Sequence, residues 1–148
     1  MREQEQTVLT EAKNRQDIEK QWRNKAILAG VCLPDNTPAH SRESLAELER
    51  LADTAEIDVV GRFVQNREQI DKTTYVGSGF LKMLIEEAEK EDADMLIFDH
   101  SLSPSQGRNI SQESNLVIAD RSEIILDIFA QHAQTNEAKL QVQLAQLE

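Results

Sequence analysis

The chain has 148 residues, of which 39% are hydrophobic and 29% charged, and its formal net charge at pH 7 is −11. This length is typical of one domain, and the hydrophobic content is enough for one core, so the composition argues against an intrinsically disordered protein. The acidic balance excludes a protein whose whole surface binds nucleic acid or an anionic membrane.

From the sequence we expect neither a membrane span nor a signal peptide. Residues 1–24 are mostly polar, and we predict a leader that is partly helical or flexible. No apolar region follows the charges of residues 1–6, and the longest uncharged apolar run, residues 26–34, is too short to span a bilayer. The single cysteine, Cys32, excludes an internal disulfide and is expected to be buried. We therefore expect a cytoplasmic protein without a membrane span.

The first regular elements follow directly. The apolar run of residues 26–32 predicts a strand covered on both faces, and residues 34–38 form a loop rich in turn residues. Ser44 and Glu47 have the spacing of a capping box, which predicts that a helix begins at Ser44. Residues 57–65 are then predicted as a second strand.

The same alternation continues along the chain. A second helix is expected after residues 75–79, a third strand at 95–98, a short helix near Pro104 and a fourth strand at 116–119. Strands that alternate with helices predict an α/β fold, here a small four-stranded parallel sheet with helices on both faces.

The C-terminal part has a different pattern. Residues 120–123 resemble a capping box, and an apolar stripe follows it. From residue 135 the chain is strongly helical, with leucines at 140, 144 and 147, and this pattern has not ended at Glu148. We predict an α/β domain over residues 25–134 and, over residues 135–148, the first part of a truncated helical hairpin.

Most motifs that would carry chemistry are missing. No two glycines have the spacing of a P-loop, and Gly77 and Gly79, which precede a predicted helix, fit either an anion-binding turn or a turn that docks the helix. The three histidines and Cys32 lack the spacing of metal ligands, so we predict no metal site. Residues 99–101 read Asp-His-Ser, but residues adjacent in sequence do not form a catalytic triad, and we predict a polar turn.

The best candidates for contact with a ligand or partner lie at the ends of the predicted strands. Open parallel sheets bind ligands beyond the carboxyl ends of their strands. Residues 99–109 and the pair Asp120–Arg121 occupy such ends, and Arg108 and Arg121 are local cations in an acidic chain.

Several segments together resemble one protein family. They are residues 75–79 (YVGSG), 102–109 (LSPSQGRN), 120–131 (DRSEIILDIFAQ) and 137–147 (EAKLQVQLAQL). In this order they resemble the N-terminal region of the HflX family of ribosome-associated GTPases, and the similarity covers about residues 25–148. Phe80 stands where this family usually has a lysine.

The resemblance implies a function for the chain. Proteins of this family have an N-terminal α/β domain, a helical hairpin and a G domain that hydrolyses GTP, and they bind the large ribosomal subunit during the splitting or rescue of ribosomes. We expect this chain to be a docking module for the large ribosomal subunit, without catalysis or a cofactor of its own. GTP and Mg²⁺ are expected in the parent protein, which would also supply the G domain and the partner helix of the hairpin. The candidate contact residues are Tyr75, Gly77, Gly79, Asp99, Ser103, Gln106, Arg108, Asn109, Asp120, Arg121 and Lys139.

Two alternatives remain open at this stage. The chain is an independent ATP-binding α/β domain if residues 77–79, Asp99 and Arg108 form one site. It is an interaction scaffold if Leu140, Leu144 and Leu147 pack on a partner helix or on a second copy of the chain.

Overall fold

The fold is built on one parallel sheet. A computed structural model describes residues 24–133 of the chain. Its strands are β1 (Asn24–Cys32), β2 (Ile57–Asn66), β3 (Met95–Phe98) and β4 (Val117–Asp120). They form a four-stranded sheet in the order β2-β1-β3-β4, in which every neighbouring pair is parallel. The predicted α/β class and parallel sheet are confirmed.

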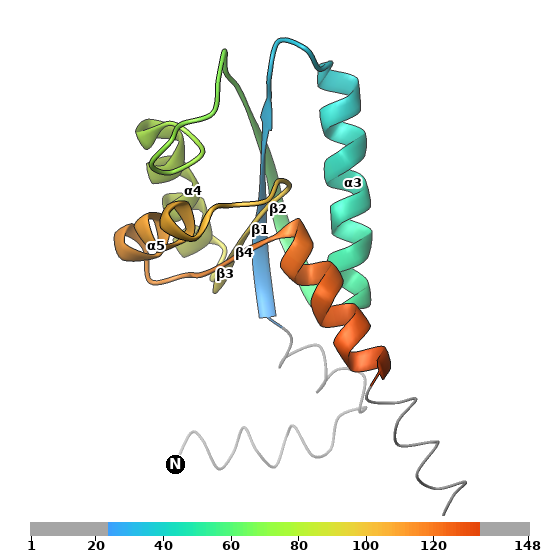
Figure 1. The fold of residues 1–148 in the computed structure, drawn as a ribbon. Helices are drawn as coiled ribbons and strands as arrows, with labels where there is room; N and C mark the ends of the chain where they lie inside the picture. The colour runs from blue at the N-terminus through green and yellow to red at the C-terminus, as the bar shows by residue number, and fades with distance from the viewer. Residues whose placement is uncertain (1–23, 134–148) are drawn as a thin grey trace, which may run out of the picture.

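Helices cover both faces of the sheet. They are α3 (Pro38–Thr54), α4 (Ser78–Lys90), α5 (Pro104–Glu113) and a helix at residues 121–133, called helix 121–133 below. Figure 1 shows α3 and helix 121–133 on one side of the sheet and α4 and α5 on the other. In the described part of the chain, no helix is long and apolar enough to cross a membrane.

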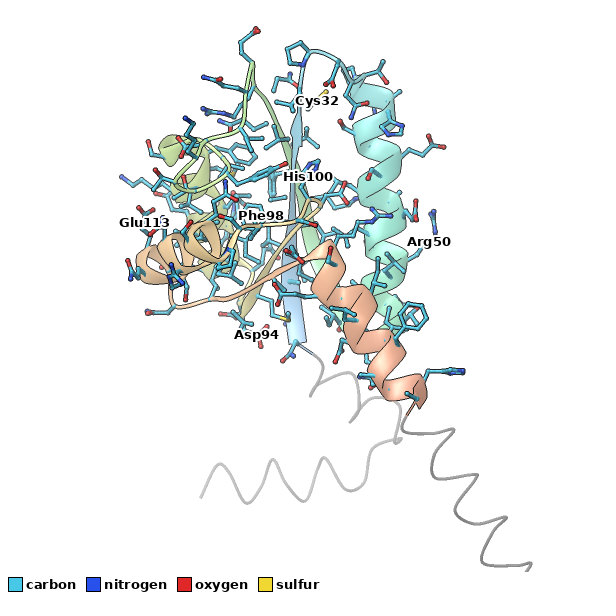
Figure 2. The ribbon with its side chains drawn as sticks, viewed as in Figure 1. Cys32, Arg50, Asp94, Phe98, His100 and Glu113 are labelled. Carbon is cyan, nitrogen blue, oxygen red and sulfur yellow. The ribbon has the colours of Figure 1, made fainter. Side chains whose placement is uncertain are left out.

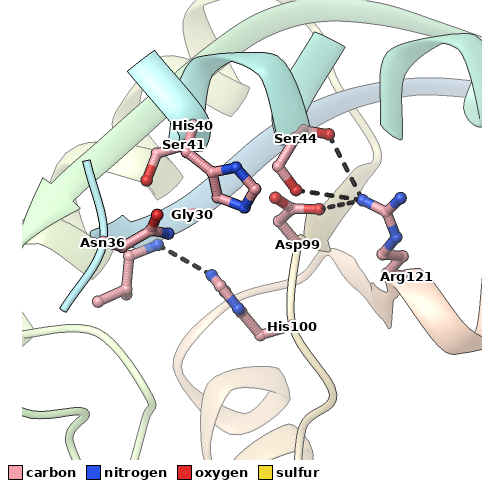
Figure 3. A pocket seen from close by; sticks show the side chains of 9 residues that line it. Gly30, Asn36, His40, Ser41, Ser44, Asp99, His100 and Arg121 are labelled. Carbon is pink, nitrogen blue, oxygen red and sulfur yellow. Dashed lines mark hydrogen bonds and ion pairs between the residues drawn. The ribbon is translucent and has the colours of Figure 1, made fainter. Parts of the chain in front are cut away.

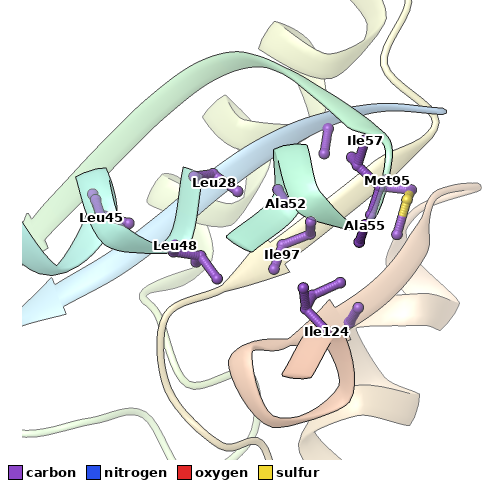
Figure 4. Close-up of a cluster of buried hydrophobic side chains, with 11 residues drawn as sticks. Leu28, Leu45, Leu48, Ala52, Ala55, Ile57, Met95, Ile97 and Ile124 are labelled. Carbon is purple, nitrogen blue, oxygen red and sulfur yellow. The ribbon is translucent and has the colours of Figure 1, made fainter. Parts of the chain in front are cut away.

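The central strand supplies both cores because alternate side chains of a strand point to opposite faces. Ala26 and Leu28 of β1 belong to the core beneath α3, together with Leu48, Ile97 and Ile124 (Figure 4). Their neighbours Ile27 and Ala29 belong to the other core, beneath α4 and α5. This double burial explains the continuous apolar run that predicted the strand, and Cys32, at its end, is buried as expected.

The predicted start of the first helix is wrong. α3 begins at Pro38, and Ser44 lies in its second turn. Thr37 is the N-cap, and its Oγ1 accepts a hydrogen bond from the His40 N–H at 3.1 Å. A threonine cap followed by proline in the first turn is a stronger start signal than the pair Ser44 and Glu47, because proline has no N–H to satisfy and its φ already suits a helix.

The predicted capping box before helix 121–133 is confirmed. Asp120 Oδ1 accepts a hydrogen bond from the Glu123 N–H at 3.0 Å, and Asp120 Oδ2 accepts one from the Leu102 N–H at 2.9 Å. Asp120 therefore fixes both the start of this helix and the loop after β3. The predicted leader, apart from residue 24, and the predicted hairpin over residues 135–148 lie outside the described residues.

The topology creates one position suited to a ligand. The chain moves from β1 to β2 on one side and returns to β3 on the other, so β1 and β3 separate at their carboxyl ends into loops that run in opposite directions. Ligands of open parallel sheets bind at this switch point. In Figure 2, Cys32 marks the carboxyl end of the sheet and Asp94 the opposite end.

Candidate functional site

A polar pocket lies at the switch point between β1 and β3. Its volume is about 300 Å³. It is lined by Gly30, Val31, Asn36, His40, Ser41, Ser44, Asp99, His100 and Arg121 (Figure 3). These residues come from four places in the fold: the end of β1 and its loop, the first two turns of α3, the end of β3, and the start of helix 121–133.

An ion pair forms one wall of the pocket. Arg121 Nη1 lies 2.8 Å from Asp99 Oδ1, and Arg121 Nη2 lies 2.7 Å from Glu47 Oε1. Arg121 Nη1 also donates to the backbone oxygen of Ser44 at 3.4 Å and to its Oγ at 3.3 Å. The Asp99 side chain is only 4% exposed, so its charge depends on Arg121 for compensation. The sequence placed Asp99 and Arg121 at neighbouring strand ends, and the structure joins them directly.

His100 lines the pocket next to the core that lies beneath α4 and α5. Its Nε2 accepts a hydrogen bond from the Val31 N–H at 3.3 Å, and its ring stacks on Tyr75 with the centroids 5.2 Å apart. Burial lowers the pKa of His100, while the nearby Asp99 carboxylate partly opposes that change. The imidazole is therefore neutral at pH 7, as its role as an acceptor requires.

Tyr75 reaches His100 from an unusual backbone conformation. Its φ is 65°, in the left-handed region that side chains rarely adopt. Two backbone hydrogen bonds of 2.9 Å between Asp71 and Tyr75 hold this turn. Hydrogen bonds from the backbone N–H groups of Thr74 and Thr73 lower the pKa of Asp71. A non-glycine residue at positive φ is retained only where its surroundings fix it, and here they fix the ring against His100.

Helix α5 also holds the turn between Asp71 and Tyr75. Gln106 Nε2 donates to the Asp71 backbone oxygen, and Asn109 Nδ2 donates to the Thr73 backbone oxygen, both at 3.0 Å. Gln106 and Ser103 also form the capping box of α5. The predicted site residues Tyr75, Ser103, Gln106 and Asn109 are thus brought together as one structural cluster beside the pocket.

The two predicted glycines lie elsewhere, at the start of α4. Gly77 is the N-cap, and its N–H already donates to Gln65 Oε1 at 2.9 Å. A Cβ at Gly77 would lie 2.6 Å from Arg67 Nη1, which is the end of a flexible side chain, and a Cβ at Gly79 would meet nothing within 4 Å, so rigid packing requires neither glycine. This geometry fits the turn that docks the helix.

The remaining predicted residues do not join the pocket. Arg108 is exposed on α5 and lines a second cavity of about 600 Å³ beside β4. Asp99 lies on the α3 side, and Gly77 packs against β2, so the residues of the ATP-site alternative are not brought into one place. Lys139 lies outside the described residues.

Sequence reasoning missed most of the pocket lining. Asn36, His40 and Ser41 come from the loop after β1 and the start of α3, which the misplaced helix start concealed. His40 and His100 are 60 positions apart, yet they line the same cavity. The signal that was available is Thr37-Pro38, which places the first turn of a helix at the switch point. Within residues 24–133, no group of three or more His, Cys, Asp or Glu side chains is placed to hold a metal ion.

Comparison with known proteins decides the family. The family model described as "GTP-binding GTPase N-terminal" matches residues 42–130, which is more than half of the chain. The chain belongs to this family, as an N-terminal domain of the HflX type. A relative named GTPase HflX from Alkalihalophilus pseudofirmus is 43% identical over 132 residues, covering 89% of this chain and 31% of the relative. Another GTPase HflX, from Escherichia coli, is 39% identical over 105 residues, covering 71% of this chain and 25% of the relative.

Solved structures agree with this assignment. A GTP-binding protein from the archaeon Sulfolobus solfataricus in complex with GDP aligns with a TM-score of 0.55 and 25% identity. It covers 84% of this chain, and the match occupies 36% of that protein. A structure titled as the complex of SsGBP and GDP aligns with a TM-score of 0.56, 25% identity and the same coverage of this chain, over 34% of its own. This HflX-type chain thus spans between a quarter and just over a third of the length of these proteins.

Proposed function

We propose that this chain is the ribosome-docking N-terminal domain of a longer HflX-type GTPase. The observation that carries the proposal is the family match over residues 42–130, joined to relatives that bear the name GTPase HflX. In this proposal the chain contacts the large ribosomal subunit, while GTP and Mg²⁺ are bound by the part of the longer protein that this chain does not match. The domain itself positions the GTPase and performs no catalytic step.

The carboxyl end of the sheet is the surface that we propose for docking. Ribosomal RNA presents phosphates, so contacts need exposed cations. Lys72 and Arg108 are both exposed, and the hydrogen bond from Asn109 to the Thr73 backbone oxygen holds their two segments together. Two exposed cations on neighbouring segments give an acidic protein local positive charge that RNA can approach.

Arg121 has a different role in this proposal. Its guanidinium already bonds to Asp99 and Glu47, and its side chain is 23% exposed. A cation that is held by two carboxylates attracts a phosphate weakly. We therefore assign Arg121 to the positioning of helix 121–133 and assign docking to Lys72 and Arg108.

Co-sedimentation with purified large ribosomal subunits tests the docking surface. We expect the 148-residue chain to pellet with the subunits at low salt, and the double variant Lys72→Glu/Arg108→Glu to lose most of that binding because two attractive charges become repulsive. The matched control is Lys90→Glu, an exposed lysine in the last turn of α4 at the opposite end of the sheet, which should pellet like the parent chain. Equal pelleting of the double variant and the parent chain would exclude this surface.

A further inference from the structure

We infer that the leader, residues 1–23, covers one side of helix 121–133 and that Trp22 of the leader packs on the exposed ring of Phe129. The leader lies outside the described residues, and Phe129 lies within them. This inference uses neither Lys72 nor Arg108, so it does not depend on the proposed docking to the ribosome.

The surface to be covered is the side of helix 121–133 that faces α3. Arg121, Ile125 and Phe129 recur at every fourth residue, so they lie along one side of this helix. Arg121 bonds to Ser44 and Glu47 of α3, which shows that this side is turned toward α3. Ile125 is partly buried there, but the described residues leave Phe129 66% exposed. Single exposed apolar side chains are common, so other observations must identify what covers Phe129.

The described chain begins beside this surface. Asn24, the first residue of β1, pairs with Ile57, and Ile57 belongs to the buried cluster against which Ile128 packs. Ile128 directly precedes Phe129. Figure 1 likewise shows the start of β1 and the end of helix 121–133 at the same end of the molecule. The leader therefore joins the fold within a short distance of Phe129.

The alternation of side chains along β1 directs Trp22 toward the same side of the sheet. Ala26 and Leu28 belong to the core beneath α3, and Ile27 belongs to the core on the other face. Counting back from Ala26 in steps of two residues places Trp22 on the face of α3 and helix 121–133. Trp22 precedes Asn24 by two residues, which is about 7 Å of extended chain. Contact with Phe129 therefore needs no long connection.

The composition of the leader suits this contact. Ile18 and Trp22 are four residues apart, so in a helix both would face one partner. An indole and a phenyl ring are well matched, because aromatic pairs are stabilised beyond the area that they bury. Residues 1–23 contain equal numbers of basic and acidic side chains, so the net charge of −11 does not repel them.

Two other occupants fit this surface less well. Residues 134–148 continue directly from helix 121–133, and residues 130–148 contain neither glycine nor proline, so the sequence offers no turn that folds them back onto Phe129. A second copy of the chain carries the same charge of −11, and two copies repel each other. The leader has neither disadvantage.

The fluorescence of Trp22 tests the contact in the whole 148-residue chain, because this residue is the only tryptophan. We expect the native chain to emit at a shorter wavelength than the urea-unfolded chain and to be quenched less by acrylamide, since the indole is removed from water. Phe129→Ala should raise the acrylamide quenching constant of the native chain about twofold, because the indole loses its aromatic neighbour. Equal quenching of the parent chain and Phe129→Ala would overturn the inference.

The matched control for fluorescence is Ile70→Ala. Ile70 is an apolar residue that is 38% exposed, and it lies in the loop after β2, at the opposite end of the sheet from Asn24. Its truncation should leave the quenching of Trp22 unchanged. The same increase in Ile70→Ala as in Phe129→Ala would also contradict the contact.

A double-mutant cycle gives a second measurement that does not depend on fluorescence. We expect Trp22→Ala to lower the urea midpoint of the parent chain but not that of Phe129→Ala, because side chains in contact have non-additive effects. Fully additive midpoints would overturn the inference. Quenching and light scattering are also measured over a range of protein concentrations, and both should be constant. Quenching that falls as a dimer forms would assign Phe129 to a second copy and exclude the leader.

Discussion

Arg121 connects three parts of the molecule through one side chain. It begins helix 121–133 and bonds to Asp99 at the end of β3 and to Ser44 and Glu47 on α3. Removing one partner of a buried pair is more costly than never having the pair, because the remaining charge stays desolvated. Asp99 is the buried partner here, so the loss of Arg121 leaves a carboxylate with no compensation.

We expect Arg121→Gln to lower the free energy of unfolding by about 3 kcal/mol for that reason. Urea denaturation measures this change, and the double variant Asp99→Asn/Arg121→Gln should lose less than the single change because no charge is then stranded. The matched control is Arg62→Gln. Its bridge to Glu49 spans 3.3 Å with side chains 45% and 42% exposed, and it should cost under about 1 kcal/mol. Equal losses for the two arginines would contradict the buried-pair explanation.

His100 gives the fold a dependence on pH. Burial lowers the pKa of the folded imidazole below the 6.5 of an unperturbed histidine, so the unfolded chain takes up a proton first as the pH falls. Its contribution to stability is complete above pH 6.5 and is lost progressively as the pH drops below that value toward the folded pKa.

We therefore expect the unfolding free energy to fall between pH 7.5 and pH 5.5, and the variant His100→Gln to reduce this decline. Glutamine retains an acceptor for the Val31 N–H but does not titrate. The measurement is urea denaturation at both pH values, with His132→Gln, an exposed histidine on helix 121–133, as the control. An unchanged decline in His100→Gln would remove His100 as its cause.

Among the elements, helix 121–133 shows how one amphipathic segment divides its side chains. Ile124 is 4% exposed and belongs to the core beneath α3, whereas Leu126 and Phe129 are each 66% exposed. The apolar stripe in the sequence contains both kinds of residue. Spacing alone therefore predicted the helix without showing which apolar residues the sheet covers.

Truncation of the two kinds of residue should give different results. We expect Ile124→Ala to destabilise the fold by about 2–4 kcal/mol, through lost burial and the cavity that remains. Leu126→Ala on the same helix should change stability by no more than about 0.5 kcal/mol, since leucine and alanine have similar helix propensities and the side chain is solvated. Chemical denaturation followed by circular dichroism compares them, and similar losses would mean that Leu126 is buried in solution.

The elements that sequence predicted best are those whose signal is local. β3 has the predicted bounds of residues 95–98 because an apolar run of four is closed by polar residues on both sides. α5 begins at Pro104 as expected, because Ser103 and Gln106 form its capping box within four residues. α3 was misplaced because two cap signals compete there, and only packing shows that Ser41 and Leu45 already belong to the buried face.

For the whole molecule, the net charge of −11 governs how it approaches a polyanion. General repulsion opposes binding to RNA, so the docking that we propose would rest on a few local cations and would weaken as salt rises. When co-sedimentation is measured across a salt series, the slope of log affinity against log salt concentration should become less negative by about 1–2 on loss of Lys72 and Arg108. Each phosphate contact contributes somewhat less than one to that slope. This expectation separates electrostatic docking from apolar contact through Leu126 and Phe129, which salt would not weaken.

The sequence by itself determined the α/β class, the parallel sheet, most element bounds and the HflX resemblance, since these depend on local periodicity, caps and contiguous motifs. Only the tertiary structure decided what the predicted site residues do. It joined Asp99 to Arg121, used Gln106 and Asn109 to hold the turn of Tyr75, and placed His40, Ser41 and His100 around one pocket. The physical reason is the crossover at the switch point. It brings together side chains that are far apart in the chain, and no local sequence pattern specifies their hydrogen-bond partners.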